Sequence, residues 1–158
     1  MSHTPDIAHQ ILRVHTLPVH YLDVGSGERT VLLIHGGGSD HAQLSWRETI
    51  PALSAHYRVL SPDLPGYGRT PFVPTRRLLA YYSDLLLDWL EALKVQRLSV
   101  AGISMGGAVA LGMVLQQPER FEKLVLVGSY GLSERVPYPV LGYLAVRLPG
   151  LHALVRWL

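Results

Sequence analysis

The stretch Leu98-Ser99-Val100-Ala101-Gly102-Ile103-Ser104-Met105-Gly106-Gly107 decides the fold of this 158-residue chain. Its first four residues form an apolar run typical of a strand buried on both faces, and a helical pattern follows over residues 105–117. Between them stands G-x-S-x-G, the pattern of a serine on a sharp strand-to-helix turn. Such a turn exposes the Ser104 hydroxyl at a helix N-terminus, where the Met105 amide favours a developing oxyanion. The alternative interpretation is a chance match of two glycines around a serine.

Further apolar runs alternate with helical patterns on both sides of this stretch. The other expected buried strands cover residues 31–34, 57–60 and 124–127, and an antiparallel pair separated by Pro18 covers 11–17 and 19–24. The expected helices cover residues 47–54, 76–94 and 105–117. This alternation predicts an α/β fold with a mostly parallel sheet and flanking helices. Ligands in such folds bind at the carboxyl ends of the strands.

A glycine-rich loop, His35-Gly36-Gly37-Gly38, follows the expected strand 31–34. Its backbone N–H groups could point toward Ser104 and complete an oxyanion hole. A phosphate cradle is the competing interpretation, although neither G-x-G-x-x-G nor the P-loop lysine pattern is present. We expect His35 to brace the loop by hydrogen bonds, with a catalytic role as the alternative.

The segment Asp63-Leu64-Pro65-Gly66-Tyr67-Gly68-Arg69-Thr70 follows the expected strand 57–60. A catalytic acid is one interpretation of Asp63. A turn-forming residue is favoured, because an aspartate side chain can accept hydrogen bonds from the backbone that follows it.

In chain order, HGGG at 35–38, DLPGYGRT at 63–70 and GISMGG at 102–107 resemble the α/β-hydrolase superfamily, and the resemblance spans nearly the whole chain. HGGGS and the stretches 46–53 and 120–128 are most similar to the branch of meta-cleavage-product (carbon–carbon bond) hydrolases, cofactor-free haloperoxidases and carboxylesterases. The resemblance implies that Ser104 is the nucleophile and that the amides of Met105 and of Gly37 or Gly38 bind the oxyanion.

The same resemblance leads us to expect substrate contacts from Ile103 and Trp46. Carbon–carbon hydrolases usually carry asparagine just before the nucleophile, whereas this chain has Ile103. This departure favours simple ester hydrolysis at least as much as carbon–carbon cleavage.

Two regions are expected from the resemblance: residues 1–131 as the N-terminal part of the hydrolase core, without its C-terminal strands, and 132–158 as the start of a helical cap. In the superfamily the catalytic acid and histidine follow the serine along the chain, and here Glu134 and His152 follow Ser104. A private Glu134–His152 dyad is the alternative to an incomplete triad. We expect the chain as given to be inactive without a downstream Asp and His, and to form homo-oligomers.

Composition excludes several classes of function. With 48% hydrophobic and 16% charged residues, the chain is not intrinsically disordered. Its net charge of +2 comes without the clustered positive face that nucleic-acid binding needs. The absence of cysteine excludes disulfides and thiolate metal sites. Asp84, Asp88 and Glu91 could be imagined as a metal cluster, but a solvated helix face is the favoured interpretation. We expect neither a metal nor a cofactor.

The ends of the chain bear on its location. The N-terminal MSHTPDIAHQ lacks the charged and apolar regions of a signal peptide, so we expect a cytoplasmic protein. The apolar stretch 136–158 contains prolines and arginines and fits two short amphipathic helices better than a membrane span, with a membrane-surface role as the alternative.

The sequence therefore predicts a serine hydrolase acting on a small ester or related carbonyl compound through an acyl-enzyme on Ser104. The alternative is a non-catalytic module that keeps the pocket and binds a ligand there.

Overall fold

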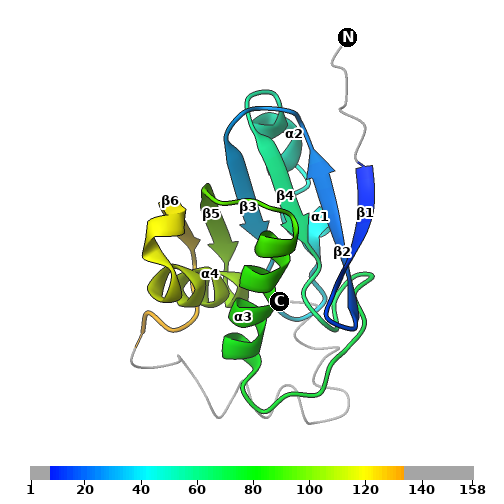
Figure 1. Cartoon of the computed structure of the whole chain (residues 1–158). Helices are drawn as coiled ribbons and strands as arrows, with labels where there is room; N and C mark the ends of the chain where they lie inside the picture. The colour runs from blue at the N-terminus through cyan, green and yellow to red at the C-terminus, as the bar shows by residue number, and fades with distance from the viewer. Residues whose placement is uncertain (1–7, 134–158) are drawn as a thin grey trace, which may run out of the picture.

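The computed structural model describes residues 8–133, and within them the chain forms a six-stranded sheet in the order β1-β2-β4-β3-β5-β6 (Figure 1). The strands are β1 (Ala8–Val14), β2 (Leu17–Val24), β3 (Thr30–Ile34), β4 (Arg58–Pro62), β5 (Leu98–Ile103) and β6 (Phe121–Val127). Strands β3 to β6 are parallel, whereas β1 and β2 pair antiparallel at one edge. The predicted α/β fold with a mostly parallel sheet is confirmed.

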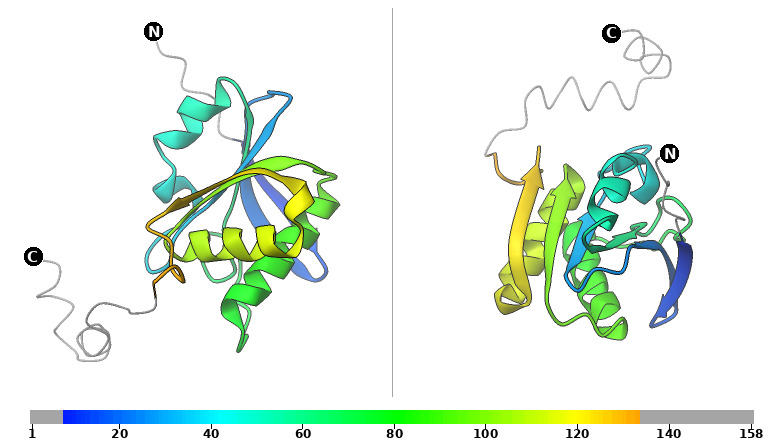
Figure 2. Two further views of the ribbon diagram at one scale, coloured as in Figure 1. Left: turned by 90° about the vertical axis from the view of Figure 1, so that its left-hand side faces the viewer. Right: turned by 90° about the horizontal axis from the view of Figure 1, so that it is seen from above.

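Helices lie on both faces of this sheet (Figure 2, left). On one face lie α3 (Leu78–Ala92) and α4 (Met105–Gln116), followed by the 3₁₀ helix η1 (Pro118–Arg120). On the other face lie two short helices, α1 (Ala42–Ser45) and α2 (Thr49–Ser54). Each face buries its own apolar cluster, with Tyr82 and Trp89 on the α3 side and Trp46 and Ile50 on the α1–α2 side.

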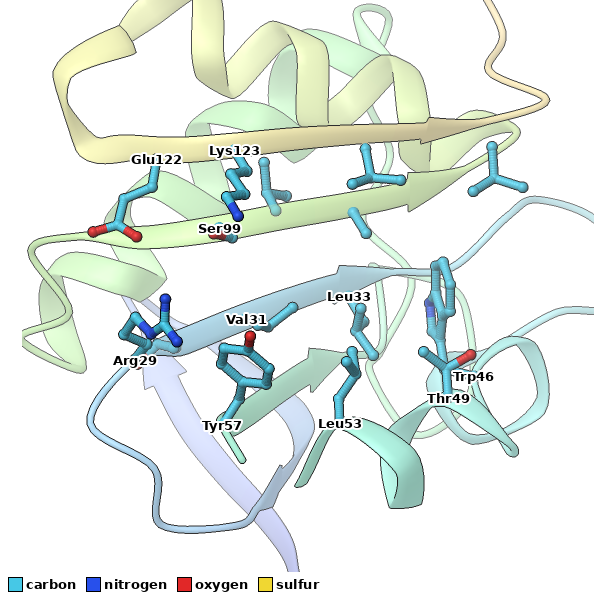
Figure 3. A pocket seen from close by; sticks show the side chains of 15 residues that line it. Arg29, Val31, Leu33, Trp46, Thr49, Leu53, Tyr57, Ser99, Glu122 and Lys123 are labelled. Carbon is cyan, nitrogen blue, oxygen red and sulfur yellow. The ribbon is translucent and has the colours of Figure 1, made fainter. Parts of the chain in front are cut away.

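The α1–α2 face is covered unevenly. Helices α1 and α2 contact β2 and β4, while β5 and β6 carry no helix on this face within the described residues (Figure 2, right). Between α2 and β6 lies a groove of about 310 Å³ with an apolar floor, lined by Val31, Leu33, Val125 and Val127 among others. Figure 3 shows this groove, with Arg29 and Tyr57 at one end and Trp46 at the other.

Two local features differ from the sequence prediction. The β1–β2 turn lies at His15–Thr16, with His15 at a φ of +53°, whereas Pro18 lies inside β2 opposite Arg13. Proline is tolerated there because β4 pairs only with Tyr21–Val24, so one side of Pro18 has no ladder partner that needs its missing N–H. The helix expected over 47–54 is α2 and begins two residues later, whereas the short helix α1 before it was not expected.

The expected helical cap begins at residue 132, and residues 134–158 lie outside the described residues. Between residues 8 and 133, no helix is both long and apolar enough to cross a membrane.

Candidate active site

Ser104 is the junction between β5 and α4. Its φ of +52° lies in the left-handed region, which is strained for a residue with a side chain and is typical of functional sites. The Ser104 N–H donates to the Val127 carbonyl (2.9 Å), and its own carbonyl accepts from the N–H groups of Gly107 (3.1 Å) and Tyr130 (3.0 Å). These bonds to α4 and to the end of β6 hold the serine in its strained conformation with the residue exposed.

The glycines around Ser104 are required by close backbone packing. A Cβ on Gly102 would lie 2.2 Å from the Gly106 carbonyl oxygen, and one on Gly106 would lie 2.3 Å from the His35 carbonyl oxygen. Both distances are far below any real Cβ contact. The G-x-S-x-G pattern is therefore explained by the sterics of this junction, and a chance match is not needed.

Ser104 opens into a cavity of about 350 Å³. Its other lining residues are Met105 on α4, Tyr130 after β6, and Leu78 and Leu79 at the start of α3. Among the described residues, no histidine or carboxylate lines this cavity. The arrangement offers an exposed hydroxyl and apolar walls to a small, mainly apolar ligand.

The glycine-rich loop lies next to this serine. A Cβ on Gly36 would lie 3.6 Å from Ser104 Cβ, and one on Gly37 would lie 3.7 Å from Met105 Cβ. Gly38 has a φ of +79° and would have no heavy atom within 4 Å of an added Cβ. The structure therefore brings Gly36 and Gly37 next to the side chains of Ser104 and Met105, while Gly38 lies further out.

His35 braces this loop, as the sequence predicted. The buried ring donates from Nδ1 to the Gly36 carbonyl (2.7 Å), and its Nε2 accepts from the Leu64 N–H (2.9 Å). Burial lowers the pKa of His35, which favours the neutral ring that this pair of bonds requires. With both ring nitrogens occupied, His35 has no nitrogen left to take a proton from Ser104.

Asp40 is a second brace that sequence reasoning missed. Its carboxylate accepts from the N–H groups of Gly36 (2.9 Å) and His41 (2.9 Å) and from the Ser45 hydroxyl. Desolvation opposes its ionisation, but the hydrogen bonds from Ser45, Gly36 and His41 outweigh this and lower the pKa of Asp40. The signal was available, because an aspartate just after a glycine loop often caps local backbone N–H groups.

Asp63 is buried and holds its own turn, as predicted, by accepting from the Arg69 N–H (2.9 Å). It also accepts from the Ala42 N–H (3.0 Å) and pairs with His20 Nδ1 (2.7 Å). His20 Nε2 in turn lies 3.1 Å from His9 Nδ1. The carboxylate thus joins the 63–70 loop to α1 and β2, and it does not line the Ser104 cavity.

Ile103 and Trp46 lie on the other side of the sheet from this cavity. Both belong to the apolar cluster under α1 and α2, and neither lines the cavity that contains Ser104. Trp46 is 7% exposed, and its buried Nε1 has no hydrogen-bond partner among the described residues. Their contact with substrate stays a prediction.

Two sets of candidate residues from the sequence remain: the alternative catalytic dyad and the acidic cluster considered as a metal site. Glu134 and His152 lie outside the described residues. Asp84, Asp88 and Glu91 each have a separate partner, respectively Gln116 Nε2 (3.0 Å), His15 Nε2 (2.9 Å) and Arg120 Nη2 (3.6 Å). In the part of the chain that the structure describes, no three potential ligands gather to hold a metal ion.

Comparison with known proteins shows which family the chain matches. The model of a family described as the alpha/beta hydrolase fold matches residues 29–147. The chain is 39% identical over 118 residues to the 2-hydroxy-6-oxo-6-(2'-aminophenyl)hexa-2,4-dienoic acid hydrolase of Metapseudomonas resinovorans, covering 71% of this chain and 39% of the relative. It is 35% identical over 129 residues to the 2-hydroxy-6-oxo-6-phenylhexa-2,4-dienoate hydrolase of Comamonas testosteroni, covering 78% and 45%. The chain therefore spans less than half the length of these curated relatives.

Solved structures agree with the sequence relatives. The 2-hydroxy-6-oxo-6-phenylhexa-2,4-dienoate hydrolase from Rhodococcus sp. strain RHA1 superposes with a TM-score of 0.81 at 28% identity, over 97% of this chain and 65% of that one. A serine hydrolase involved in carbazole degradation superposes with a TM-score of 0.76 at 32% identity, over 89% and 55%.

Proposed function

This chain belongs to the α/β-hydrolase family, and from that premise we propose that it is a serine hydrolase with Ser104 as its nucleophile. The observation that carries the proposal is the conformation of Ser104. A strained, positive φ at the junction of a parallel strand and a helix presents the serine beside the glycine-rich loop and at the mouth of a cavity.

In the proposed reaction, Ser104 Oγ attacks the carbonyl carbon of the substrate while a base takes its proton. The resulting oxyanion binds the amide of Met105 and an amide of Gly37 or Gly38. The tetrahedral intermediate collapses, and the alcohol leaves with the proton returned by the base. Water then attacks the acyl-enzyme and releases the acid, which restores the Ser104 hydroxyl.

The proposed reaction needs a base that the described residues do not bring to Ser104. The described cavity lining lacks a histidine and a carboxylate, and His35 has both ring nitrogens bonded. We propose that an Asp and a His downstream of these residues complete the triad in a longer polypeptide. The alternative is the pair of Glu134 and His152, both of which lie outside the described residues.

We propose a small ester or related carbonyl compound as the substrate. The relatives are hydrolases of 2-hydroxy-6-oxo-dienoates, by the names they carry. Carbon–carbon hydrolases usually carry asparagine just before the nucleophile, whereas this chain has Ile103 there. This departure supports ester hydrolysis at least as much as carbon–carbon cleavage.

A non-catalytic ligand-binding module is the second candidate. The described cavity lining favours it in one respect, because that lining keeps the serine and apolar walls without a histidine or an acid.

We also propose that copies of the chain associate through the part of the sheet at β5 and β6 that no described helix covers.

The decisive experiment measures turnover of p-nitrophenyl acetate and of a 2-hydroxy-6-oxo-dienoate by the longest natural polypeptide that contains these residues. We expect ester turnover in the wild type and a loss of about 10³-fold or more in kcat for Ser104→Ala. Ser99→Ala, on the same strand but outside the Ser104 cavity, is the matched control and should keep wild-type kcat.

Two outcomes would count against the proposal. Equal turnover by the Ser104→Ala variant and the wild type would remove Ser104 from the mechanism. A folded wild type that binds esters without hydrolysing either substrate would establish the ligand-binding module instead.

A further inference from the structure

Tyr67 is held firmly in the loop that faces the glycine-rich loop. Its N–H donates to the Leu64 carbonyl (2.9 Å), and its carbonyl accepts from the Thr70 N–H (3.0 Å). The glycines on either side, Gly66 and Gly68, have φ values of +87° and +52°, which a side chain would strain. The turn therefore fixes the backbone position from which the Tyr67 ring extends.

The ring of Tyr67 packs on a side chain that is itself locked. It meets the His35 imidazole in an edge contact, with ring centroids 5.1 Å apart and planes at 60°. His35 is bonded at both nitrogens, to Gly36 and to Leu64. The glycine-rich loop and the Tyr67 loop are thus joined through one imidazole, and the direction of the phenol is set by this contact.

The hydroxyl of Tyr67 ends between the two groups that are proposed to bind the oxyanion. Tyr67 Oη donates to Met105 Sδ at 3.8 Å. A Cβ built on Gly37 would lie 3.6 Å from Tyr67 Oη and 3.6 Å from Met105 Sδ. The hydroxyl and the Met105 sulfur therefore lie together beside Gly37.

We infer that Tyr67 is a positioning residue of the oxyanion hole, acting through the Met105 side chain. This inference rests on the proposed hydrolase function. The hydroxyl fixes the Met105 side chain against Gly37, and this fixes the separation of the two backbone N–H groups that receive the developing charge. Preorganised donors of this kind lose effectiveness when their spacing relaxes.

The kinetic test removes the hydroxyl and its acceptor separately and together. Tyr67→Phe keeps the ring on His35 and deletes only the hydrogen bond, so we expect kcat to fall roughly threefold to tenfold with KM nearly unchanged. Met105→Leu keeps the backbone amide and removes the sulfur, and should cause a similar fall. In the double variant the two losses should not multiply, because both remove the same contact.

The matched control is Tyr57→Phe, a tyrosine on the opposite face of the sheet that lines the groove of Figure 3. It should leave kcat and KM unchanged. Losses that multiply in the double variant would show that the Tyr67 hydroxyl acts without Met105 and would overturn the inference. An unchanged kcat in Tyr67→Phe would overturn it as well.

A second readout does not depend on turnover and separates this inference from the proposed function. The chain has three methionines, so the ¹³C-methyl signal of Met105 can be followed beside that of Met113, which lies on the buried side of α4. Tyr67→Phe should shift and narrow the Met105 methyl signal, as a freed side chain does, while Met113 stays unchanged. A Met105 signal that does not respond overturns the positioning role even if Ser104 proves to be the nucleophile. Inactivity of the wild type would overturn the proposed function, whereas the methyl signal would still decide whether Tyr67 positions Met105.

Discussion

His35 shows how one side chain can couple the candidate site to pH. Burial lowers its pKa from 6.5, so the folded protein keeps the ring neutral where the unfolded chain would already bind a proton. The groups that face it are the Gly36 carbonyl, Asp63, Asp40 and His41. The Gly36 carbonyl, Asp63 and Asp40 raise the pKa of His35, whereas His41 lowers it. Together these groups do not offset the effect of burial, so the pKa of His35 is lowered overall.

This direction predicts acid sensitivity. Stability from His35 is fully present above pH 6.5 and is lost as the pH falls through 6.5 toward the lower folded pKa, because the unfolded state then binds more protons. Because the pKa of His9 is also lowered, His9→Gln serves as the parent protein for this comparison. The free energy of unfolding, measured with urea at several values between pH 8 and pH 5, should fall less steeply for the parent carrying His35→Gln than for the parent alone. The exposed His56→Gln is the control, and parallel curves for His35→Gln and its parent would contradict the prediction.

The glycines of the serine junction allow a sharper steric test. Gly106→Ala would push a Cβ against the backbone carbonyls of His35 and Ile34, which cannot move away cheaply. We expect a loss of about 1–3 kcal/mol in unfolding free energy, or more if the strands must separate. Gly37→Ala is the matched control, because its Cβ would make ordinary contacts at 3.6 Å. Equal stability of the two variants in urea unfolding would show that the junction is looser than described.

For single residues, the sequence was informative where a side chain contacts residues that lie close to it in the chain. Ser104, its glycines and the bracing by His35 could be predicted because strand, turn and helix follow one another within a few positions. Asp40 could have been found from its place beside the loop. Tyr67 and the pair of Asp63 with His20 could not, because each contact joins segments that only the tertiary fold brings together.

Among the elements, the connection from α4 to β6 depends on a buried arginine. Arg120 is 7% exposed, and its Nε and Nη2 donate to the Val95 carbonyl at 3.1 and 2.6 Å. Its Nη1 donates to Gln117 Oε1 at 3.1 Å. This fork ties the start of β6 to the loop before β5 and so supports the pairing of those two strands.

Arg120→Met keeps much of the side-chain volume but leaves the Val95 carbonyl without its donors. We expect a loss of about 1–3 kcal/mol in unfolding free energy, the usual cost of an unsatisfied buried acceptor. Arg97→Met, which removes an exposed ion pair with Glu122, should cost about 0–1 kcal/mol. Urea unfolding of both variants tests this prediction. An equal loss of unfolding free energy in the two variants would mean that Arg120 acts as an ordinary surface charge.

Long helices were easier to predict from the sequence than short ones. The stripe of apolar residues placed a helix over 76–94, and the structure has α3 at Leu78–Ala92. Helix α1 has four residues, too few to show a period, and was missed. Strand β6 begins three residues earlier than expected, because Glu122 and Lys123 are exposed on a bare sheet and read as loop residues.

For the molecule as a whole, the alternation of strands and helices predicted the class but not the strand order. Placing β4 between β2 and β3 depends on pairings between distant segments, which leave no local trace in the sequence. The surface of β5 and β6, which no helix between residues 8 and 133 covers on the α1–α2 side, is likewise visible only once the helices are in place.

This surface predicts association of the 158-residue chain. Val125 and Val127 line the groove of Figure 3 and are 53% and 42% exposed, and an exposed apolar patch of this kind favours association with another chain. Light scattering should give a mass above the 17.5 kDa of one chain. Replacing both valines with lysine should lower it toward that of the monomer, whereas Leu115→Lys on α4, which is 75% exposed, should not. A monodisperse wild-type monomer would contradict the prediction.

The hydrogen bonds of Ser104 also set the order in which the reactive geometry can arise during folding. Its amide is bonded to Val127 at the end of β6, and its carbonyl to the Tyr130 amide just beyond. A folding intermediate in which β5 and α4 have formed but β6 has not docked would leave the Ser104 backbone free to relax out of its strained conformation. We therefore expect the Ser104 amide proton to become protected from exchange with solvent only when β6 joins the sheet. Ser104 would in this sense reach its strained conformation only after β6 has docked, and each transient opening of β6 in the native state would let that conformation relax again.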